Sequence, residues 1–211
     1  MRHSFRLPRV YPITDTHISG LSHADQVALF AEGGATLVQL RDKHASPLHF
    51  YEQAKAALEV ATQRRVQLIV NDRADIALAV GAAGVHLGQD DLPPEAARRL
   101  LGSEAVIGYS SHTVEQALAA ATLPIDYLAI GPVFATSTKQ DPSPVVGLNG
   151  VRAVREAIGG LPLVAIGGIT HANARDVIEA GADSVAMISG LLATPSEIPV
   201  AVRALRETLP A

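Results

Sequence analysis

Short runs of aliphatic residues recur along the chain, and helical patterns or small-residue turns separate them. Such runs are typical of strands in a parallel sheet that is covered by helices. The pattern predicts strands at Val10–Thr14, Leu37–Arg41, Gln67–Asn71, Gly84–Leu87, Val106–Tyr109, Tyr127–Ile130, Leu163–Ile166 and Ser184–Met187. Helical patterns lie between them, for example over Leu48–Arg64, Pro94–Leu101 and Ala172–Ala180, with a last one near Pro199–Thr208.

One unit of sequence repeats, consisting of a helix, a turn of small residues and a short strand. Copies lie at Glu32–Leu40, Val80–Leu87 and Ala180–Met187, and the glycine in each turn is expected to end a helix in the left-handed conformation. The spacing corresponds to units of about 25 residues, so eight units fill the chain. Strand–helix alternation predicts right-handed crossovers and a parallel sheet. We therefore expect an α/β fold with one domain over residues 1–211, a (β/α)₈ TIM barrel, in preference to an open doubly wound sheet.

The composition limits the function. Hydrophobic residues make up 48% of the chain and aromatic residues 4%, so aliphatic side chains must build the core. The absence of cysteine excludes disulfides and thiolate metal sites. A net charge of −4 provides no basic face for nucleic acid, and no apolar run approaches the ~20 residues that span a bilayer. The basic start is not followed by the apolar stretch of a secretory signal. We expect a soluble cytoplasmic enzyme for small molecules, without nucleic-acid or membrane partners and compatible with a homo-oligomer.

Polar residues follow the second predicted strand, at the end of the barrel where active sites form. Gln39 and Arg41 have the same parity and are expected to face the same side of the strand, where buried polar groups need partners or a ligand. Alternatively, Arg41 leaves the strand for solvent. Lys43 is one of only three lysines, against fourteen arginines. Arg41 and Lys43 together suit a diphosphate, because the guanidinium offers a fork of N–H donors and the ammonium a compact positive charge.

Carboxylates follow the third and fourth strands. Asp72 comes directly after a strand, and Asp90 and Asp91 occupy the next loop along the sheet. One carboxylate from each loop, with phosphate oxygens and water, is a usual arrangement for Mg²⁺. Asp72 could instead cap the following helix, and parity does not separate Asp90 from Asp91.

Hydroxyl and histidine side chains follow the fifth strand. Ser110 is expected nearest the barrel mouth, and Thr113 is a good helix cap. His112 could act as a general base, but a loop histidine without a visible carboxylate partner is more often structural. His86, inside the fourth strand, is expected to be a hydrogen-bonded interior residue.

The last three loops carry features of a second anion site. Thr136, Thr138 and Lys139 form a compact set after the sixth strand, although such loops are often only turns. Glycines follow the seventh and eighth strands, where barrels often bind phosphate through backbone N–H groups. The sequence therefore predicts one site for two anions.

With these residues in view, the chain resembles the thiamine-phosphate synthase family. The similarity runs from Tyr11 to Ser189 and rests on six segments in order at the strand ends. They are Val38-Gln-Leu-Arg-Asp-Lys43, Asn71-Asp-Arg73, Val85-His-Leu-Gly-Gln-Asp-Asp91, Ser110-Ser-His-Thr113, Gly131-Pro-Val-Phe-Ala-Thr-Ser-Thr-Lys139 and Ala165-Ile-Gly-Gly-Ile169.

The resemblance implies that hydroxymethylpyrimidine diphosphate is joined to thiazole phosphate, giving thiamine phosphate and diphosphate. It implies Mg²⁺ at Asp72 and Asp91. It places the pyrimidine diphosphate at Gln39, Arg41, Lys43, Asn71, Ser110 and Lys139, and the thiazole phosphate at Thr136, Thr138, Gly168, Ile188 and Ser189. We count Leu40, Asp42 and Ser137 among the substrate-binding residues as well, and expect Arg41, Lys43, Ser110 and Lys139 to support catalysis.

The reaction that the resemblance implies is dissociative: diphosphate leaves, a pyrimidine cation forms, and the thiazole nitrogen captures it. Such a reaction needs charge stabilisation and close placement of two substrates. Pro12, Tyr109 and Ser111 are less typical of the family's motifs. The alternatives are a thiazole tautomerase-like isomerase and a non-catalytic thiazole- or thiamine-phosphate binding protein. A Schiff-base aldolase would need a lysine in a strand, and no predicted strand contains one.

Overall fold

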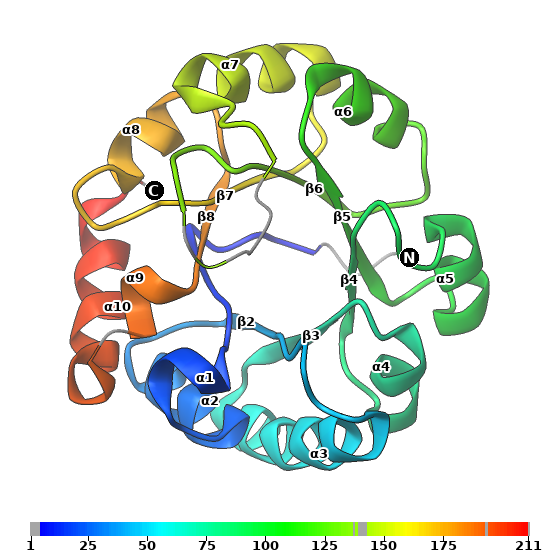
Figure 1. Ribbon diagram of the computed structural model, residues 1–211, viewed down its shortest axis with the longest axis vertical. Coiled ribbons are helices and arrows are strands. Elements are labelled where there is room, and N and C mark those ends of the chain that lie inside the picture. The colour runs from blue at the N-terminus through cyan, green and yellow to red at the C-terminus, as the bar shows by residue number, and fades with distance from the viewer. Residues whose placement is uncertain (1–4, 137, 139–142, 193, 211) are drawn as a thin grey trace.

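The computed structural model describes residues 5–136, 138, 143–192 and 194–210. Its parallel sheet has eight strands in the order β1-β8-β7-β6-β5-β4-β3-β2. Ile13 forms an isolated parallel bridge to Gln39, which joins the first strand to the second and closes the sheet into a ring (Figure 1). The predicted single (β/α)₈ barrel is confirmed. The strands are β1 Val10–Pro12, β2 Leu37–Leu40, β3 Gln67–Asn71, β4 Gly84–Leu87, β5 Val106–Ser111, β6 Tyr127–Ile130, β7 Leu163–Ile166 and β8 Ser184–Met187.

Helices surround the ring of strands, as Figure 1 shows. They are α1 Thr16–Ser19, α2 His23–Glu32, α3 Pro47–Arg64, α4 Ala74–Val80, α5 Pro94–Leu101, α6 Val114–Ala120, α7 Gly147–Ile158, α8 Ala174–Glu179, α9 Ser189–Leu192 and α10 Ile198–Thr208, with a 3₁₀ turn at Pro195–Glu197. Among the described residues, no helix has the length and apolar character that crossing a membrane requires.

Three strands differ from their predicted bounds. β2 ends at Leu40, one residue before the predicted Arg41. β1 ends at Pro12, two residues early, because proline has no N–H for the ladder and only the bridge at Ile13 follows. β5 continues to Ser111, since Ser110 and Ser111 pair with β6 opposite Ala129 and Ile130. The added length carries the Ser110 side chain to the end of the barrel.

The repeated turns behave largely as the sequence predicts. Gly81 ends α4 in the left-handed conformation (φ 76°), and Gly181 follows α8 with φ 112°. In the first copy the left-handed residue is Gly34 (φ 91°), whereas Gly33, directly after the last residue of α2, keeps right-handed dihedrals (φ −72°). Thr113 caps α6 by accepting a hydrogen bond of 3.2 Å from Gln116 N.

The core has two layers, because successive strand residues point to opposite faces of the sheet. Residues such as Val38 and Leu40 pack between the strands and the helices. The barrel interior holds Tyr11, Leu37 and Tyr127, among others. The last inward-facing side chain of each strand is therefore placed at the mouth of the barrel.

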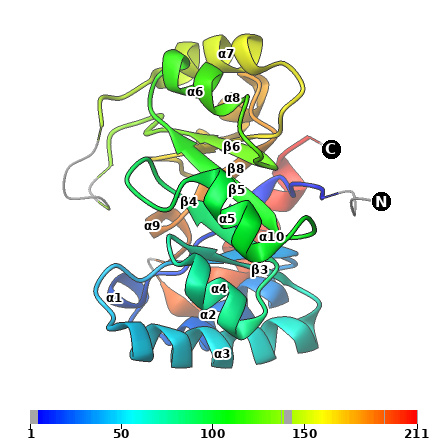
Figure 2. The same cartoon turned by 90° about the vertical axis from the view of Figure 1, so that its right-hand side faces the viewer.

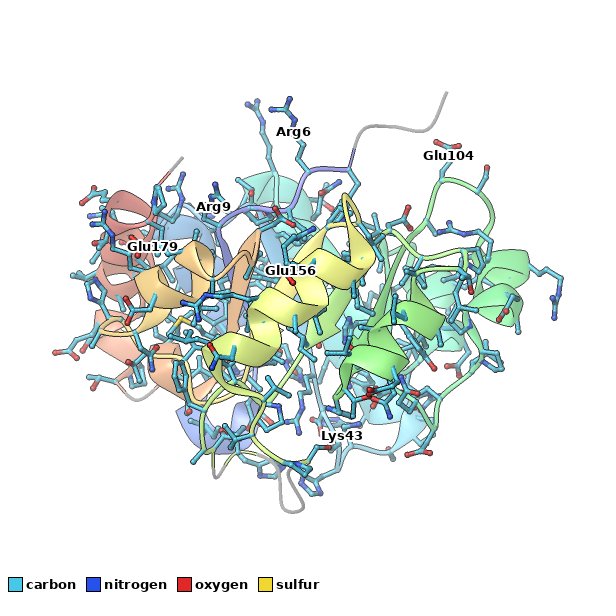
Figure 3. The ribbon with its side chains drawn as sticks, turned by 90° about the horizontal axis from the view of Figure 1, so that it is seen from above. Arg6, Arg9, Lys43, Glu104, Glu156 and Glu179 are labelled. Atoms are coloured by element: carbon cyan, nitrogen blue, oxygen red, sulfur yellow. The ribbon has the colours of Figure 1, made fainter. Side chains whose placement is uncertain are left out.

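Two ion pairs of the same design fasten the helices at the amino ends of the strands. Arg98 on α5 contacts Asp126 at 2.7 Å, and Arg155 on α7 contacts Asp183 at 2.5 Å. Each carboxylate also accepts a backbone N–H of a strand. Figure 3 shows Lys43 at the opposite end of the barrel from Arg6, Arg9 and Glu104. Figure 2 likewise shows the blue segment that leads into β1 at the end opposite α1 and α9, so these ion pairs lie away from the site described next.

Candidate active site

A cavity of about 560 Å³ opens at the carboxyl ends of the strands. Its volume falls within the range of small-molecule sites. Most of the residues that the sequence singles out line it, and they come from seven of the eight strand ends, those of β2 to β8. They are Gln39, Arg41, Lys43, Asn71, Asp72, Asp91, Ser110, Thr136, Thr138, Gly168, Ile188 and Ser189. The predicted residues Ser137 and Lys139 lie outside the described residues.

Leu40 and Asp42, which we counted among the substrate-binding residues, lie outside the cavity. Leu40 is fully buried and packs toward the helices, because it alternates with the inward-facing Gln39. Asp42 accepts backbone hydrogen bonds from His44 and Ala45, and its carboxylate lies 3.7 Å from His23. Neither residue therefore lines the cavity.

Arg41 faces the cavity rather than leaving for solvent. Its side chain is only 18% exposed, and its Nη1 donates a 2.9 Å hydrogen bond to Asp15 just after β1. Its backbone N–H donates to the hydroxyl of Thr14 at 3.2 Å. The predicted parity of Gln39 and Arg41 is therefore confirmed. Sequence reasoning missed Asp15, although its position directly after the first strand placed it at the same end of the barrel.

Asp72 does not cap a helix. The helix that follows it, α4, begins after Arg73 and has no side-chain cap. Asp72 instead forms an ion pair with Lys43. Its backbone is in the left-handed region (φ 62°), unusual for a residue with a side chain, and its N–H donates to the carbonyl of His86 at 2.8 Å. The capping alternative for Asp72 is therefore wrong.

Asp91 is the carboxylate of the β4 loop that interacts with Asp72. Burial raises the pKa of Asp91, and the hydrogen-bonded, like-charged carboxylate of Asp72 raises it further. The N–H of Gly88 donates to Asp91 at 2.7 Å and opposes this shift. Asp90 also lines the cavity but is exposed. The structure therefore pairs Asp91, rather than Asp90, with Asp72.

The two histidines near the site are held by neutral partners. His86 is buried between Tyr127, whose hydroxyl lies 3.0 Å from its Nδ1, and Ser110, whose hydroxyl lies 2.9 Å from its Nε2. Burial lowers the pKa of His86 to about 4, so the ring is neutral near pH 7. His112 contacts the carbonyl of Gly131 through Nδ1 at 2.6 Å. Both histidines therefore have the structural roles that the sequence favoured.

The loops after β6, β7 and β8 meet on the other side of the cavity. The hydroxyl of Thr138 lies 3.4 Å from that of Ser189, and the N–H of Thr138 donates to Thr136. Gly168 has φ 63°, and a Cβ there would lie 2.5 Å from the carbonyl oxygen of Ala135. Glycine is thus required for the β7 loop to pack against the loop after β6. The predicted hydroxyl and glycine residues form one group.

Tyr11 and Tyr127 also line the cavity, and sequence reasoning did not single them out. Both are fully buried at inward-facing positions of β1 and β6. The sequence could have pointed to them, because each is a tyrosine at a strand position that faces the barrel interior, in a chain with few aromatic residues. Of the less typical residues, Ser111 donates to the carbonyl of Ala129 at 3.0 Å, whereas Tyr109 packs against the outer core and does not line the cavity.

Comparison with known proteins agrees with this arrangement. The model of a family described as thiamine monophosphate synthase matches residues 10–191. A thiamine-phosphate synthase of Chloroflexus aurantiacus is 47% identical over 94% of this chain and 91% of its own length. The corresponding protein of Albidiferax ferrireducens is 46% identical over 100% of this chain and 97% of its own.

A solved structure shows the same fold. Thiamine phosphate pyrophosphorylase from Pyrococcus furiosus superposes with a TM-score of 0.85 at 37% identity, and the alignment covers 94% of both chains. The family model, the full-length relatives and this structure agree with one another. The chain therefore belongs to the thiamine monophosphate synthase family and is a transferase of thiamine biosynthesis.

Proposed function

We propose that the protein transfers the hydroxymethylpyrimidine group from its diphosphate to the ring nitrogen of a thiazole phosphate. The C–O bond to diphosphate breaks, the leaving diphosphate keeps the electron pair, and a C–N bond forms. The supporting observation is one cavity with two unlike sides. Arg41, Lys43, Asp72 and Asp91 lie on one side, and the hydroxyl and glycine group lies on the other.

The carboxylates of Asp72 and Asp91 fit a divalent cation. They come from neighbouring loops and lie close enough that each charge opposes the other, which is the cause of the raised pKa of Asp91 beyond burial. A cation between them would relieve this repulsion. Within the described residues, no group of three or more histidine, aspartate or glutamate side chains is arranged to hold a metal ion. The remaining ligands must then come from the substrate and water. We therefore propose that Mg²⁺ is held by these two carboxylates, phosphate oxygens and water.

Mg²⁺, when bound, would offset the charge that collects on the departing diphosphate. Arg41 adds a preorganised cation, because Asp15 fixes its guanidinium while leaving further N–H donors free for oxygen atoms. Lys43 lies at the cavity in contact with Asp72, so it can bind the diphosphate beside the metal. We propose that Lys139, which lies outside the described residues, contributes a third cation.

The hydroxyl and glycine group suits the monophosphate of the thiazole. Thr136, Thr138 and Ser189 provide hydroxyl donors, and Gly168 allows a phosphate to approach the backbone closely. With both substrates held in one cavity, the reacting atoms gain the effective concentration on which a dissociative transfer depends. No general base is required, in keeping with the neutral surroundings of His86 and His112.

A diphosphate-release assay tests this proposal. Purified protein is mixed with both substrates, with and without Mg²⁺, and we expect release only when both substrates and the metal are present. Asp72→Asn should lose most of the activity by weakening Mg²⁺–diphosphate binding, whereas Asp75→Asn, an exposed carboxylate paired with Arg73, should remain active. Unchanged activity and Mg²⁺ dependence in Asp72→Asn would contradict the metal assignment. Absence of metal-dependent release in the wild type would favour the isomerase or the binding protein.

A further inference from the structure

A continuous chain of hydrogen bonds crosses the interior of the barrel. Gln39 Nε2 lies 3.1 Å from the hydroxyl of Tyr11, and the hydroxyls of Tyr11 and Tyr127 lie 3.0 Å apart. The chain continues from Tyr127 to His86 Nδ1 at 3.0 Å and from His86 Nε2 to the hydroxyl of Ser110 at 2.9 Å. Its two ends, Gln39 and Ser110, are residues that we assign to the substrate, and all five side chains line the cavity.

The donors in this chain can run in only one direction. The amide nitrogen of Gln39 is a donor, so the oxygen of Tyr11 accepts. Tyr11 is 1% exposed, and its own hydrogen has one acceptor within reach among the described residues, the oxygen of Tyr127. The hydrogen of Tyr127 must then go to Nδ1 of His86. An opposite direction would leave a buried O–H without a partner, which is costly.

The tautomer of His86 determines the direction of the hydrogen bond to Ser110. An Nδ1 that accepts from Tyr127 carries no proton, so the ring is neutral and its single proton lies on Nε2. Nε2 then donates to the oxygen of Ser110. The hydroxyl hydrogen of Ser110 has no other acceptor in the described structure and is left for a ligand in the cavity. Both tyrosines remain protonated, since burial raises the pKa of each phenol.

The barrel is shaped around this chain. His86 on β4, Gly108 on β5 and Tyr127 on β6 occupy one register level across three adjacent strands. A Cβ at Gly108 would lie 2.0 Å from Cζ of Tyr127 and 2.5 Å from Nδ1 of His86. A glycine therefore opens the space through which β4 and β6 hydrogen-bond over the strand that separates them. The rings of His86 and Tyr127 also stack, with centroids 5.5 Å apart.

We propose that Tyr11, Tyr127 and His86 are positioning residues that act in series. Tyr11 orients the hydroxyl of Tyr127, Tyr127 fixes the tautomer of His86, and His86 thereby makes Ser110 a hydrogen-bond donor toward the pyrimidine diphosphate. The consequence for the reaction rests on the proposed function, whereas the tautomer does not. An acceptor atom of the substrate meets a hydroxyl that is already oriented, so the site does not need to reorganise as charge develops. Gln39 is oriented from the other end by the same chain.

The tautomer can be measured in the free protein by ¹⁵N NMR of the histidine side chains near pH 7.5. The signal of His86 is identified as the one missing from His86→Gln. We expect the Nε2–H tautomer in the wild type and in Tyr11→Phe, in which Tyr127 still donates to Nδ1. Tyr127→Phe should shift His86 toward a tautomer mixture. An Nδ1–H tautomer in the wild type would overturn the proposal, whatever the protein catalyses.

A kinetic cycle tests the effect on Ser110. Tyr127→Phe keeps the ring but removes the hydroxyl, and we expect kcat to fall about tenfold or more, while KM for the thiazole phosphate is unchanged. The same substitution in a Ser110→Ala background should have little further effect, because the two residues act as a unit. Tyr51→Phe on α3, outside the cavity, is the matched control and should behave as wild type. Fully additive losses would show that Tyr127 acts independently of Ser110 and would refute the positioning role.

Discussion

Asp15 Oδ2 holds Nη1 of Arg41 at 2.9 Å, and Asp15 Oδ1 caps α1 at the same time. Asp15→Asn would replace the charged acceptor by an amide and leave the guanidinium poorly placed. We expect KM for the pyrimidine diphosphate to rise about tenfold or more, because small misplacements near a reacting group are costly. Steady-state diphosphate release measures this effect. Asp25→Asn, an exposed residue in the first turn of α2, should not change KM, and an unchanged KM in both variants would contradict the prediction.

The pairing of Asp91 with Asp72 predicts different outcomes for two adjacent carboxylates. Asp91→Asn should raise the Mg²⁺ concentration needed for half-maximal activity by about tenfold or more, because one of two charged ligands is lost. Asp90→Asn, one residue earlier and exposed, should alter it by less than about threefold. Titration of activity with Mg²⁺ compares the two. A larger effect at Asp90 would reverse the assignment.

His23 predicts a loss of stability in acid. Burial lowers its pKa below 6.5, against the opposing charges of Asp42 and Asp15. Below about pH 6.5 the unfolded chain takes up a proton at His23 that the folded chain does not. The free energy of unfolding therefore decreases as the pH is lowered. Urea unfolding at pH 7.5 and pH 5.5 measures the decrease. His23→Asn, whose amide oxygen can still accept from Thr14, should show a smaller decrease, and equal decreases would count against this origin.

The ion pair between Arg98 and Asp126 should stabilise the fold without affecting catalysis. Asp126 Oδ2 accepts from Arg98 at 2.7 Å and from the N–H of Ile107 at 2.8 Å. Asp126→Asn is expected to lower the free energy of unfolding by about 1.5–3 kcal/mol, the range for hydrogen bonds to charged groups. Glu179→Gln, which breaks an exposed pair on α8, should cost less than about 0.5 kcal/mol. Urea titration gives both values, and a substantial loss of kcat in Asp126→Asn would be unexpected.

Gly108→Ala should be among the most damaging single-methyl additions in the barrel. The new Cβ would overlap both Tyr127 and His86, and overpacking of this kind costs about 1–3 kcal/mol or more. The matched control is Gly160→Ala, where a Cβ meets nothing within 4 Å. Thermal unfolding compares the two. Equal stability would mean that the interior can absorb a methyl group beside the hydrogen-bond chain.

Much of this arrangement could be predicted from the sequence because parallel strands bring their carboxyl ends together. Once the strands were placed, Arg41, Asp72 and Ser110 had to lie near one another, although they are far apart in sequence. Parity also placed Gln39 inside the barrel. These inferences needed only the period of a strand and the fact that the fold closes.

Other features depend on contacts that a linear pattern does not contain. The hydroxyls of Tyr11 and Tyr127 meet across the barrel interior, a distance set by strand tilt and by the space above Gly108. The choice of Asp91 over Asp90 depends on the turn of one loop, whose Gly88 N–H holds a single carboxylate. Local periodicity carries no information on either point.

The closure of the barrel is uneven, and this links binding to folding. Ile13 and Gln39 form the only bridge between β1 and β2 in the described structure, and a 2.9 Å hydrogen bond from Thr14 N to the carbonyl of Gln39 supports it. The other neighbouring strands share three or four paired positions each. Amide hydrogens along this seam should exchange fastest among the strands. A substrate held by Gln39 and by residues across the cavity would brace this seam, so hydrogen exchange along it should slow when the substrate is bound.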